Sequence, residues 1–358
     1  MYITIVCPYS LRYAGGVQQQ VLAEANFLAA QNHRVLLAAP DIGSLPGSNL
    51  HAKIETLALG RSFRIYGNGS VIPLSFPLFR LRTIASAINA CDVAHFHEPF
   101  YPFTALLLQK TKIPAVATFH AARLNHPFYR SLRGVLRPLY AKLQARIAVS
   151  PLAAETILNH FPPPVKVIPN AVKLPPRGKI KQRNDPPYLL FLGRNEKRKG
   201  LAVLVAAFQK LRADFPTLRL KLAGSGSERI TGQHIDNLGF IPESEKHALI
   251  AGATVFCAPA LYGESFGVIL LEAMARGVPV VASRIAGYDT VLQDGKNGMM
   301  FEPGNAAALT QTLALLLRDK RRQAYFSRNG LLTAKAHSWQ RIGAEHLKIF
   351  TALVESGA

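Results

Sequence analysis

The sequence predicts an α/β protein with two doubly wound domains that face a central cleft. Strand-like apolar runs alternate with helical patterns in both halves of the chain, which is typical of parallel sheets covered by helices. The 358 residues exceed the roughly 250 to 300 at which a single hydrophobic core stops growing. Between the halves, the proline-rich and basic stretch KLPPRGKIKQRNDPP interrupts the alternation and is typical of a linker. Because doubly wound sheets bind ligands at the carboxyl ends of their strands, we expect the functional site in the cleft.

The first half opens with the strand YITIVC, a helix from about residue 17 to residue 30, and the strand RVLLAAP. Four more strands follow, separated by helical patterns: DVAHFHE, AVATFH, RIAVS and VKVIP. The second half contains the strands YLLFLG, LRLKLAG, TVFCAPA and VPVVAS, with one helix from Gly200 and another through GVILLEAMARG. We expect an N-terminal domain over residues 1–170, a linker over 171–186, a C-terminal domain over 187–335, and a last helix over 336–358 that packs back towards the N-terminal domain.

The composition is that of a globular protein. Hydrophobic residues make up 49% of the chain and charged residues 18%, and no apolar stretch reaches the about 18 residues that would span a bilayer. The start, MYITIVCPYS, has no basic segment before its apolar run, so we expect a strand rather than a signal peptide, and a cytoplasmic protein. Cys7, Cys91 and Cys257 lie in or beside apolar runs without CxxC spacing, so we expect reduced core thiols rather than a disulfide or a zinc site.

A formal charge of +21 predicts an anionic partner, which is nucleic acid, an anionic lipid surface or a phosphorylated substrate. Residues 101–150 contain no Asp or Glu, and Arg130, Arg133 and Arg137 recur there at intervals that share one face of a helix. Phe128 and Tyr129 stand beside them as apolar side chains that would enter a bilayer surface. This stretch is therefore either a membrane-surface helix or an ordinary core helix with a solvated basic face.

The ten residues GESFGVILLE, 263–272, carry the clearest chemical signal. Glu264 falls in a loop before an expected helix, Glu272 lies about two turns onward inside it, and Gly267 stands at the helix start. Free backbone N–H groups at a helix start attract a pyrophosphate, and a carboxylate that accepts two hydroxyl groups is a common way to hold a ribose or a sugar. Two glutamates at this spacing are, by themselves, more often ordinary surface or core charges. The surrounding GESFG and MARGVPVVAS favour a sugar-nucleotide site.

This decapeptide resembles the Glu-x7-Glu motif of the retaining glycosyltransferases of family 4, which have the GT-B fold of two Rossmann-like domains. The resemblance covers nearly the whole chain and includes VCPYSLRYAGGVQQQVL, HFHEP, AVATFH and FLGRNEKRKG. Within that family the sequence is most similar to the phosphatidylinositol mannosyltransferases, with which it shares CPYS, a GGV loop, YGNGS, HEP, ATFH, RIAVS and GESFG. The resemblance implies an acceptor-binding N-terminal domain and a C-terminal domain that binds a nucleotide-sugar.

The resemblance also implies roles for the matching residues. His120 and Glu264 would be catalytic: the histidine contacts the transferred sugar near its C6 hydroxyl, and the glutamate fixes the sugar. Residues that bind the sugar donor would be Gly16, Arg194, Lys199, Phe266, Gly267, Val268 and Glu272. Of these, Arg194 and Lys199 would neutralise the pyrophosphate, and Glu272 would hold the ribose. Residues that bind the acceptor would be Tyr9, Tyr66, Asn68 and Ser70.

His95, His97 and Glu98 raise the alternative of a metal site. We expect no metal there, because His95 and His97 alternate with Phe96 on a strand that should be buried, and the sequence contains no Asp-x-Asp motif. The resemblance likewise implies no catalytic metal and no cofactor besides the nucleotide-sugar donor, with GDP-mannose favoured.

The resemblance implies transfer of a hexose, with mannose favoured, to a hydroxyl of a lipid or lipid-linked glycan acceptor at the inner face of a membrane. The segment after Ser70 reads VIPLSFP and lacks the basic residues that the phosphatidylinositol subgroup carries there, which argues against phosphatidylinositol itself as acceptor. The alternative is a basic, non-catalytic protein that binds a sugar nucleotide or nucleic acid. We expect no nucleic-acid partner, because such a protein has no use for GESFGVILLE and the sequence shows no nucleic-acid-binding motif.

Overall fold

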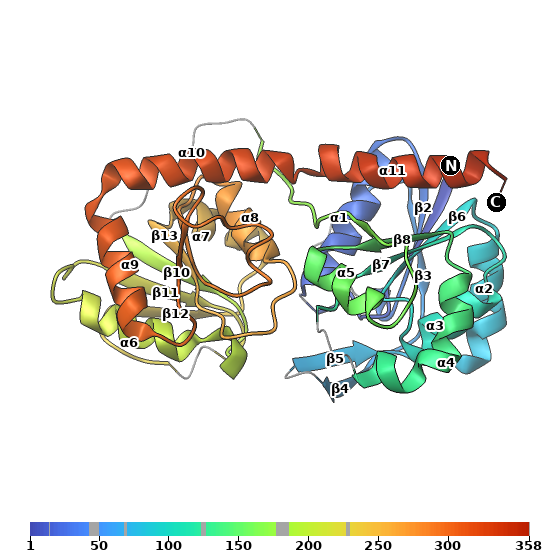
Figure 1. Ribbon diagram of the computed structural model, residues 1–358, viewed down its shortest axis with the longest axis horizontal. Coiled ribbons are helices and arrows are strands. Elements are labelled where there is room, and N and C mark those ends of the chain that lie inside the picture. The colour runs from blue at the N-terminus through green and yellow to red at the C-terminus, as the bar shows by residue number, and fades with distance from the viewer. Residues whose placement is uncertain are drawn as a thin grey trace. The chain divides into compact units, whose positions relative to one another are not determined.

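The computed structural model describes residues 1–13, 15–42, 50–67, 70–122, 127–176, 186–226 and 230–357, with only the backbone of residues 64–67, 70–74 and 127. The chain forms two compact units, whose elements are labelled in Figure 1. The first unit comprises Met1–Ala171 together with Trp339–Ala358, and the second comprises Val172–Ser338. Within the expected linker, 171–186, residues 177–185 lie outside the described part of the chain.

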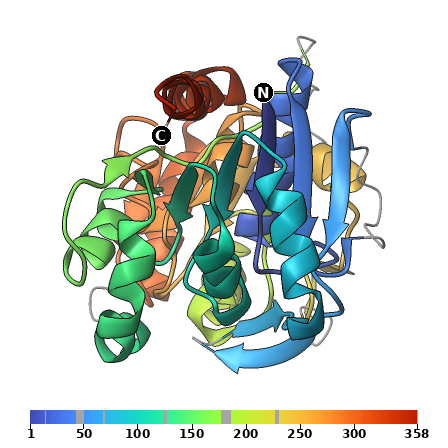
Figure 2. The same cartoon turned by 90° about the vertical axis from the view of Figure 1, so that its right-hand side faces the viewer.

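The first unit is built on a seven-stranded sheet with the order β3-β2-β1-β6-β7-β8-β9, and all neighbouring strands are parallel. Its strands are β1 (Tyr2–Val6), β2 (Arg34–Ala39), β3 (Ile54–Ala58), β6 (Val93–His97), β7 (Ala115–Phe119), β8 (Ala145–Ala148) and β9 (Lys166–Val167). Figure 2 faces this unit and shows the strands side by side. The strand order reverses between β1 and β6, and doubly wound sheets bind ligands at the carboxyl ends of strands beside such a reversal.

Helices connect the parallel strands of this unit, because a crossover between parallel neighbours needs a dozen or more residues. They are α1 (Gly16–Ala30), the short 3-10 helix η2 (Leu78–Arg80), α2 (Leu81–Asn89), α3 (Pro102–Lys110), α4 (Pro127–Ala141) and α5 (Pro151–Leu158). A separate antiparallel hairpin pairs β4 (Phe63–Gly67) with β5 (Ser70–Leu74).

The last helix, α11 (Trp339–Glu355), belongs to the first unit although it follows the second unit in sequence. It packs against α1, and Figure 1 draws the two helices next to each other. A Cβ on Gly343 would come within 2.3 Å of the Phe27 ring, so this ring packs directly on the backbone of α11 at the glycine. Trp339, Ile342 and Phe350 are buried in the core that surrounds β1 and α1. The C-terminal segment is therefore an integral part of the first unit.

The second unit has a six-stranded sheet with the order β12-β11-β10-β13-β14-β15, again parallel throughout. Its strands are β10 (Tyr188–Leu192), β11 (Arg219–Ala223), β12 (Ile235–Gly239), β13 (Val255–Ala258), β14 (Val280–Ser283) and β15 (Met299–Phe301). Its helices are the 3-10 helix η3 (Lys197–Lys199), α6 (Leu201–Leu211), α7 (Glu243–Gly252), α8 (Val268–Met274), α9 (Ala306–Arg318) and α10 (Lys320–Ala336). Here the strand order reverses between β10 and β13.

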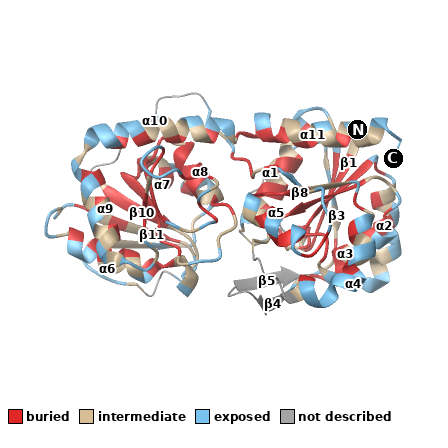
Figure 3. Cartoon of the chain, viewed as in Figure 1, coloured by how far each residue is buried: buried red, intermediate tan, exposed pale blue. Residues whose placement is uncertain are grey.

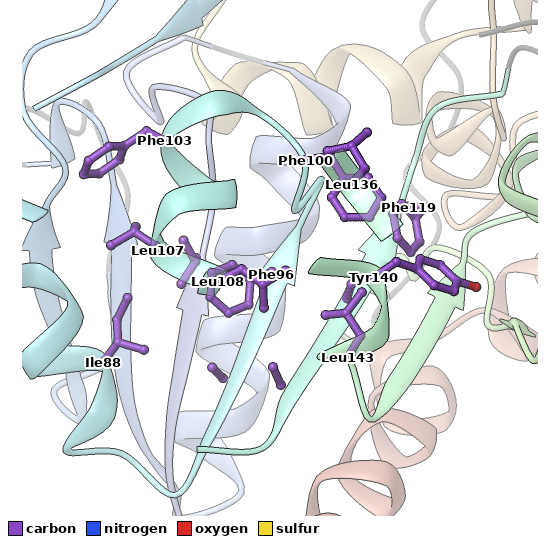
Figure 4. Packing of buried hydrophobic residues seen from close by; sticks show 14 of the residues in the cluster. Ile88, Phe96, Phe100, Phe103, Leu107, Leu108, Phe119, Leu136, Tyr140 and Leu143 are labelled. Atoms are coloured by element: carbon purple, nitrogen blue, oxygen red, sulfur yellow. The ribbon is translucent and has the colours of Figure 1, made fainter. Parts of the chain in front are cut away.

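The central strands are apolar along nearly their whole length, because helices cover both faces of each parallel sheet. In the first unit every residue of β6 and β7 is buried (Figure 3). Aromatic and aliphatic side chains from these strands, α2, α3 and α4 pack into one cluster (Figure 4). Three polar side chains on the same strands, His95, His97 and Thr118, are also buried, so they require hydrogen-bond partners inside the protein.

Helix α4 presents its arginines to solvent, since Arg130, Arg133 and Arg137 are all exposed. The expectation that Tyr129 would enter a bilayer is wrong, because its ring is only 3% exposed and packs in the core. The exposed apolar side chains of α4 are Leu132 and Val135 instead. At 3.6 residues per turn, the three arginines and these two aliphatic side chains lie on opposite sides of the helix.

None of the helices within the described ranges combines the length and the apolar character needed to span a membrane. Cys7, Cys91 and Cys257 are free and buried, so they lie in the core as expected.

Candidate active site

The site in the first unit begins at the strand reversal, where β1 leads through a short loop into α1. Gly15 precedes α1 with an extended backbone, and Gly16 is the first residue of the helix. A Cβ on Gly16 would meet no described atom within 4 Å, so the space beside this backbone is open to a ligand. This is the position at which the sequence predicted an approach of the sugar donor.

His120 lies at the carboxyl end of the neighbouring strand β7, and Glu98 holds it there. The Glu98 carboxylate oxygen Oε1 accepts hydrogen bonds from the backbone N–H groups of His120 (2.7 Å) and Ala121 (2.8 Å). Glu98 itself follows β6 with a left-handed backbone, φ 49°, that a side chain of this kind adopts rarely. Burial raises the pKa of Glu98 to about 7, opposed by these backbone hydrogen bonds. Glu98, at the end of β6, therefore holds the backbone in place at the end of β7.

A buried network of one carboxylate and four histidines connects His120 to the core. Nε2 of His120 lies 2.9 Å from Nδ1 of His97, and Nε2 of His97 lies 3.0 Å from Oε2 of Glu24. The other oxygen of Glu24 lies 2.7 Å from Nδ1 of His95 and 3.2 Å from Nδ1 of His346. Glu24 comes from α1, the two inner histidines from β6, and His346 from α11.

The network determines which nitrogen of His120 carries a proton. Burial opposes ionisation of Glu24, yet His95 and His346 hold the pKa of its carboxyl well below the usual value, so Glu24 accepts hydrogen bonds. His97 therefore donates to Glu24 through Nε2 and, when neutral, accepts from His120 at Nδ1. Burial and the neighbouring His97 hold the pKa of His120 well below its usual value. His120 is then a neutral imidazole whose Nδ1 carries the lone pair that can accept a hydrogen bond from a hydroxyl group.

Glu24, His95 and His97 form a group that is close enough to hold a metal ion. This is a different set from the one suggested by the sequence, because Glu98 turns away to the backbone of β7 and Glu24 takes its place beside the histidines. The separations of 2.7 and 3.0 Å between carboxylate and imidazole are those of hydrogen bonds, so these side chains bind one another directly in this structure. The absence of a catalytic metal remains a prediction.

The residues expected to bind the acceptor lie partly outside the described side chains. Tyr9 follows β1, and its ring meets the ring of Tyr101 edge to face at 5.3 Å. Burial raises the pKa of Tyr9 well above its usual value and that of Tyr101 to about 12, so both phenols are neutral hydrogen-bonding groups. Tyr66 and Ser70 are described by their backbone alone, in the β4-β5 hairpin, and Asn68 lies outside the described residues.

In the second unit, one glycine allows the loops after β10 and β13 to come together. Gly200 has a left-handed backbone, φ 67°, and a Cβ there would lie 1.9 Å from the Pro259 carbonyl oxygen. The backbone N–H of Leu261 donates to the Arg198 carbonyl over 2.7 Å. Only glycine permits this approach at residue 200, so the basic segment KRK of η3 lies against the loop that contains Glu264.

Glu264 precedes α8 and is neutralised by two cations. Its Oε1 accepts from Lys199 Nζ at 2.5 Å and from Arg198 Nη1 at 2.9 Å. A second acid, Glu196, pairs with Arg198 at 2.8 Å and with Arg194 at 3.0 Å. The sequence singled out Arg194 and Lys199 but missed Arg198, although it lies between them in the same basic cluster. The three cations and two acids form one connected group.

Residues 266–268 connect Glu264 to α8. Phe266 is buried, and its ring meets the ring of His337 edge to face at 6.0 Å. Gly267 has a left-handed backbone, φ 89°, directly before Val268, the first residue of the helix. This turn needs glycine, and it directs the chain from the exposed loop into the buried helix.

Glu272 lies within α8 and is buried. Its Oε1 accepts from Lys246 Nζ at 3.0 Å, and Lys246 also pairs with Glu243 at 2.7 Å. Burial raises the pKa of Glu272, opposed by Lys246. Its second oxygen, Oε2, is buried without a hydrogen-bond partner among the described residues. A buried carboxylate oxygen normally has a partner, so Oε2 is suited to accept a hydroxyl group from a ligand.

Comparisons with known proteins match both halves of the chain. The family model described as "Glycosyltransferase Family 4" matches residues 14–174, and the one described as "Glycosyl transferases group 1" matches residues 175–332. The phosphatidyl-myo-inositol mannosyltransferase of Mycobacterium leprae is 34% identical over 373 residues, covering 100% of this chain and 98% of the relative. That of Mycolicibacterium smegmatis is 33% identical over 380 residues, covering 100% and 95%.

Solved structures of glycosyltransferases share the fold. A glycosyltransferase from Rickettsia africae superimposes with a TM-score of 0.77 at 19% identity, covering 99% of this chain and 98% of the other. Anabaena HepE in complex with UDP-glucose gives a TM-score of 0.75 at 16% identity, covering 98% and 100%. These matches confirm the expected fold of two Rossmann-like domains with parallel sheets, and none of the comparisons supports the alternative of a nucleic-acid-binding protein.

Proposed function

We propose, because the chain belongs to family 4 of the glycosyltransferases, that it is a retaining mannosyltransferase which transfers mannose from GDP-mannose to a hydroxyl group of a membrane lipid. The observation that carries the proposal is in the second unit. There Glu264 is neutralised by Lys199 and Arg198, and the buried Glu272 presents an oxygen without a partner among the described residues. Cations for a pyrophosphate and an acceptor for a ribose hydroxyl are the chemistry that a sugar nucleotide requires.

Each donor contact follows from the charges in the second unit. Arg194 and Lys199 stabilise the negative charge that grows on the leaving pyrophosphate, and Arg198 adds a third cation to the same group. Glu272 accepts a ribose hydroxyl through Oε2. The role assigned to Glu264 is to accept hydrogen bonds from hydroxyls of the transferred sugar.

Glu264 is poorly suited to attack the sugar itself, because two cations already bind its Oε1 and lower its nucleophilicity. We therefore propose reaction on one face of the sugar. The bond from the anomeric carbon to the phosphate oxygen breaks as the acceptor oxygen bonds to that carbon. The hydroxyl proton passes to the phosphate oxygen that leaves. His120, neutral with a lone pair on Nδ1, accepts a hydrogen bond from the sugar hydroxyl nearby.

The acceptor role is assigned to the first unit. Tyr9 is a neutral phenol near Tyr101, and Tyr66, Asn68 and Ser70 belong to or adjoin the β4-β5 hairpin. The relatives in mycobacteria are phosphatidyl-myo-inositol mannosyltransferases, which supports a lipid acceptor. The uncharged segment VIPLSFP after Ser70 still argues against an inositol phosphate head group. We propose that the lipid reaches the enzyme at an anionic membrane surface, to which the arginines of α4 bind.

The proposal is tested by offering GDP-mannose, UDP-glucose, UDP-N-acetylglucosamine and ADP-glucose, each labelled in the sugar, with a total membrane lipid extract. We expect GDP-mannose alone to transfer label into the organic phase, and we expect the transfer to persist in EDTA. Purified phosphatidylinositol, offered separately, tests the head group. If label enters lipid from another nucleotide-sugar, that compound is the donor instead of GDP-mannose. Absence of transfer from all four would contradict the proposal.

A further inference from the structure

An apolar pocket of about 280 Å³ opens in the first unit, at the edge of the sheet where β1, β2 and β3 end. Pro8, Pro40 and Leu59 follow these three strands and form one side of it. The β4-β5 hairpin contributes Phe63 and Phe76, from its first strand and from the segment after its second. The start of α3 closes the remaining side. The pocket therefore lies at the ligand-binding edge of the sheet.

The chemistry of the lining selects an apolar ligand. The hydroxyl of Ser75 donates to the Leu59 carbonyl, and that of Thr104 donates to the Tyr101 carbonyl over 3.0 Å. The described residues that line the pocket include no charged side chain. Because the hydroxyl protons of Ser75 and Thr104 are used by the protein's own backbone, these two residues offer little to a polar group that would lose water on entry.

The pocket adjoins the site predicted for the acceptor. Tyr101 lines the pocket, and its ring meets the ring of Tyr9 edge to face at 5.3 Å. A ligand with a polar head at Tyr9 would therefore have an apolar cavity within reach of its tail. A lipid has this division into head and tail, whereas a free sugar or a soluble glycan does not.

The surroundings of the pocket suit entry from a bilayer. Phe63 is 50% exposed and Phe76 is 43% exposed at the pocket, and Phe79, three residues further, is 89% exposed. Residues 56–91 contain four arginines and no Asp or Glu, so this part of the chain attracts anionic lipid.

We propose that this pocket binds one fatty acyl chain of the lipid acceptor, withdrawn from the bilayer while the head group is glycosylated. The inference rests on the proposed transfer to a lipid. The volume of about 280 Å³ accepts on the order of ten methylene groups, if each is about as large as a water molecule. Each buried methylene strengthens binding by about fourfold, so affinity depends on chain length until the pocket is filled.

The first experiment measures binding of sodium hexanoate, octanoate, decanoate and dodecanoate by calorimetry below their micelle concentrations. We expect the affinity to rise by about fourfold for each added methylene and to level off near ten carbon atoms. The double variant Phe63→Ser, Phe76→Ser removes two exposed walls of the pocket and should weaken decanoate binding by at least about tenfold. The matched control is Phe79→Ser, which removes a more exposed ring that does not line the pocket.

A second variant, Leu59→Trp, fills the pocket from within, and its thermal unfolding shows whether it folds.

An affinity that does not depend on chain length, or equal losses of affinity in the double variant and in Phe79→Ser, would overturn the proposal. The binding assay needs no turnover, so it separates the two claims. If decanoate binds as expected but no lipid is glycosylated, the proposed function fails. If lipid is glycosylated with the same KM in the parent and the double variant, the pocket assignment fails.

Discussion

In the first unit the buried acid Glu24 is surrounded by histidines, whereas in the second unit Glu264 and Glu272 are paired with lysine and arginine. A neutral histidine donates a hydrogen bond from one ring nitrogen and accepts one at the other, while lysine and arginine only donate and keep their charge. The first arrangement can therefore fix the direction of hydrogen bonds. In our account, the second supplies constant positive charge to a leaving pyrophosphate.

Two similar sheets can therefore contribute to different parts of one reaction. Both units present their polar groups at the carboxyl ends of parallel strands beside a reversal of strand order. What distinguishes them is the partner of each carboxylate. In our account the second unit stabilises the charge of the leaving group, and the first unit orients hydroxyl groups.

The largest effect is expected in the second unit. Glu264→Gln and Lys199→Ala should each reduce kcat/KM for transfer by about a hundredfold or more, as loss of one strong transition-state contact commonly does. Steady-state transfer of labelled mannose measures this. Glu302→Gln, which changes an exposed acid of the same unit, is the control and should retain activity. Near-normal transfer by both site variants would remove the donor assignment.

The second effect concerns only the membrane. Changing Arg130, Arg133 and Arg137 together to glutamine should lower affinity for anionic vesicles on the order of a hundredfold, at about 1 kcal/mol for each charge. Co-sedimentation with anionic and neutral liposomes measures it, and salt should release the parent protein. Donor hydrolysis should be unaffected, because none of the three arginines is among the residues assigned to the donor.

The control for this variant loses the same charge from the other unit, through glutamine at three exposed positions of α10, Arg321, Arg322 and Arg328. If both triple variants lose vesicle binding equally, only net charge matters. If neither loses it, α4 is not the membrane face.

The third effect is on stability and depends on pH. The folded pKa of Glu98 is raised to about 7, so its contribution to stability is fully present below the unfolded value of about 4.3 and is lost as pH rises through 7. Glu98→Gln keeps a carbonyl oxygen for the two backbone N–H groups and does not ionise. Relative to the parent, its free energy of unfolding should rise by on the order of 2 to 3 kcal/mol from pH 5 to pH 8.

Urea unfolding at the two pH values measures this difference, and the titration of the histidines occurs in both proteins and cancels. Glu345→Gln, at an exposed ion pair with Lys166, serves as the control and should show no such trend. A constant difference between Glu98→Gln and the parent would mean that Glu98 is ionised throughout.

The fourth effect is smaller and tests the direction of hydrogen bonds. In Glu24→Gln the amide can donate to Nε2 of His97, which would then carry its proton on Nδ1 and donate to His120. Nδ1 of His120 would become a donor instead of an acceptor, and kcat should fall by about tenfold with little change in the donor KM. Nitrogen NMR of the imidazoles distinguishes the two tautomers. An unchanged His120 tautomer with reduced kcat would show that Glu24 acts only through stability.

The sequence predicted the central elements well because they are continuously apolar. The strands YITIVC, DVAHFHE and AVATFH correspond to β1, β6 and β7, and the helix expected over residues 17–30 is observed as Gly16–Ala30. The edge strands β3, β12 and β15 were missed. Two of them, IETLA and IDNLG, mix polar with apolar residues, since an edge strand is only partly buried.

The candidate site was predictable where its residues are close in sequence. GESFGVILLE gave the positions of Glu264 in a loop and Glu272 in a helix, and both are observed there. Lys246, which pairs with Glu272, lies 26 residues away in a helix that was not expected. Glu24 and His346 are separated by 322 residues, and the expectation that the last helix packs back towards the N-terminal domain did not identify this pair. Such contacts arise from tertiary packing alone.

The most direct test of the central claim, that carboxylates paired with lysine and arginine hold the sugar nucleotide, is the affinity of GDP for Glu272→Gln. The ionised oxygen Oε2 would be lost as an acceptor for the ribose, and a hydrogen bond to a charged group contributes about 1.5 to 3 kcal/mol. Calorimetry should therefore show GDP binding weakened by about tenfold to a hundredfold. Glu243 pairs with the same Lys246 but is half-exposed, so the variant Glu243→Gln should bind GDP like the parent. Equal affinity in the parent and in Glu272→Gln would contradict the account.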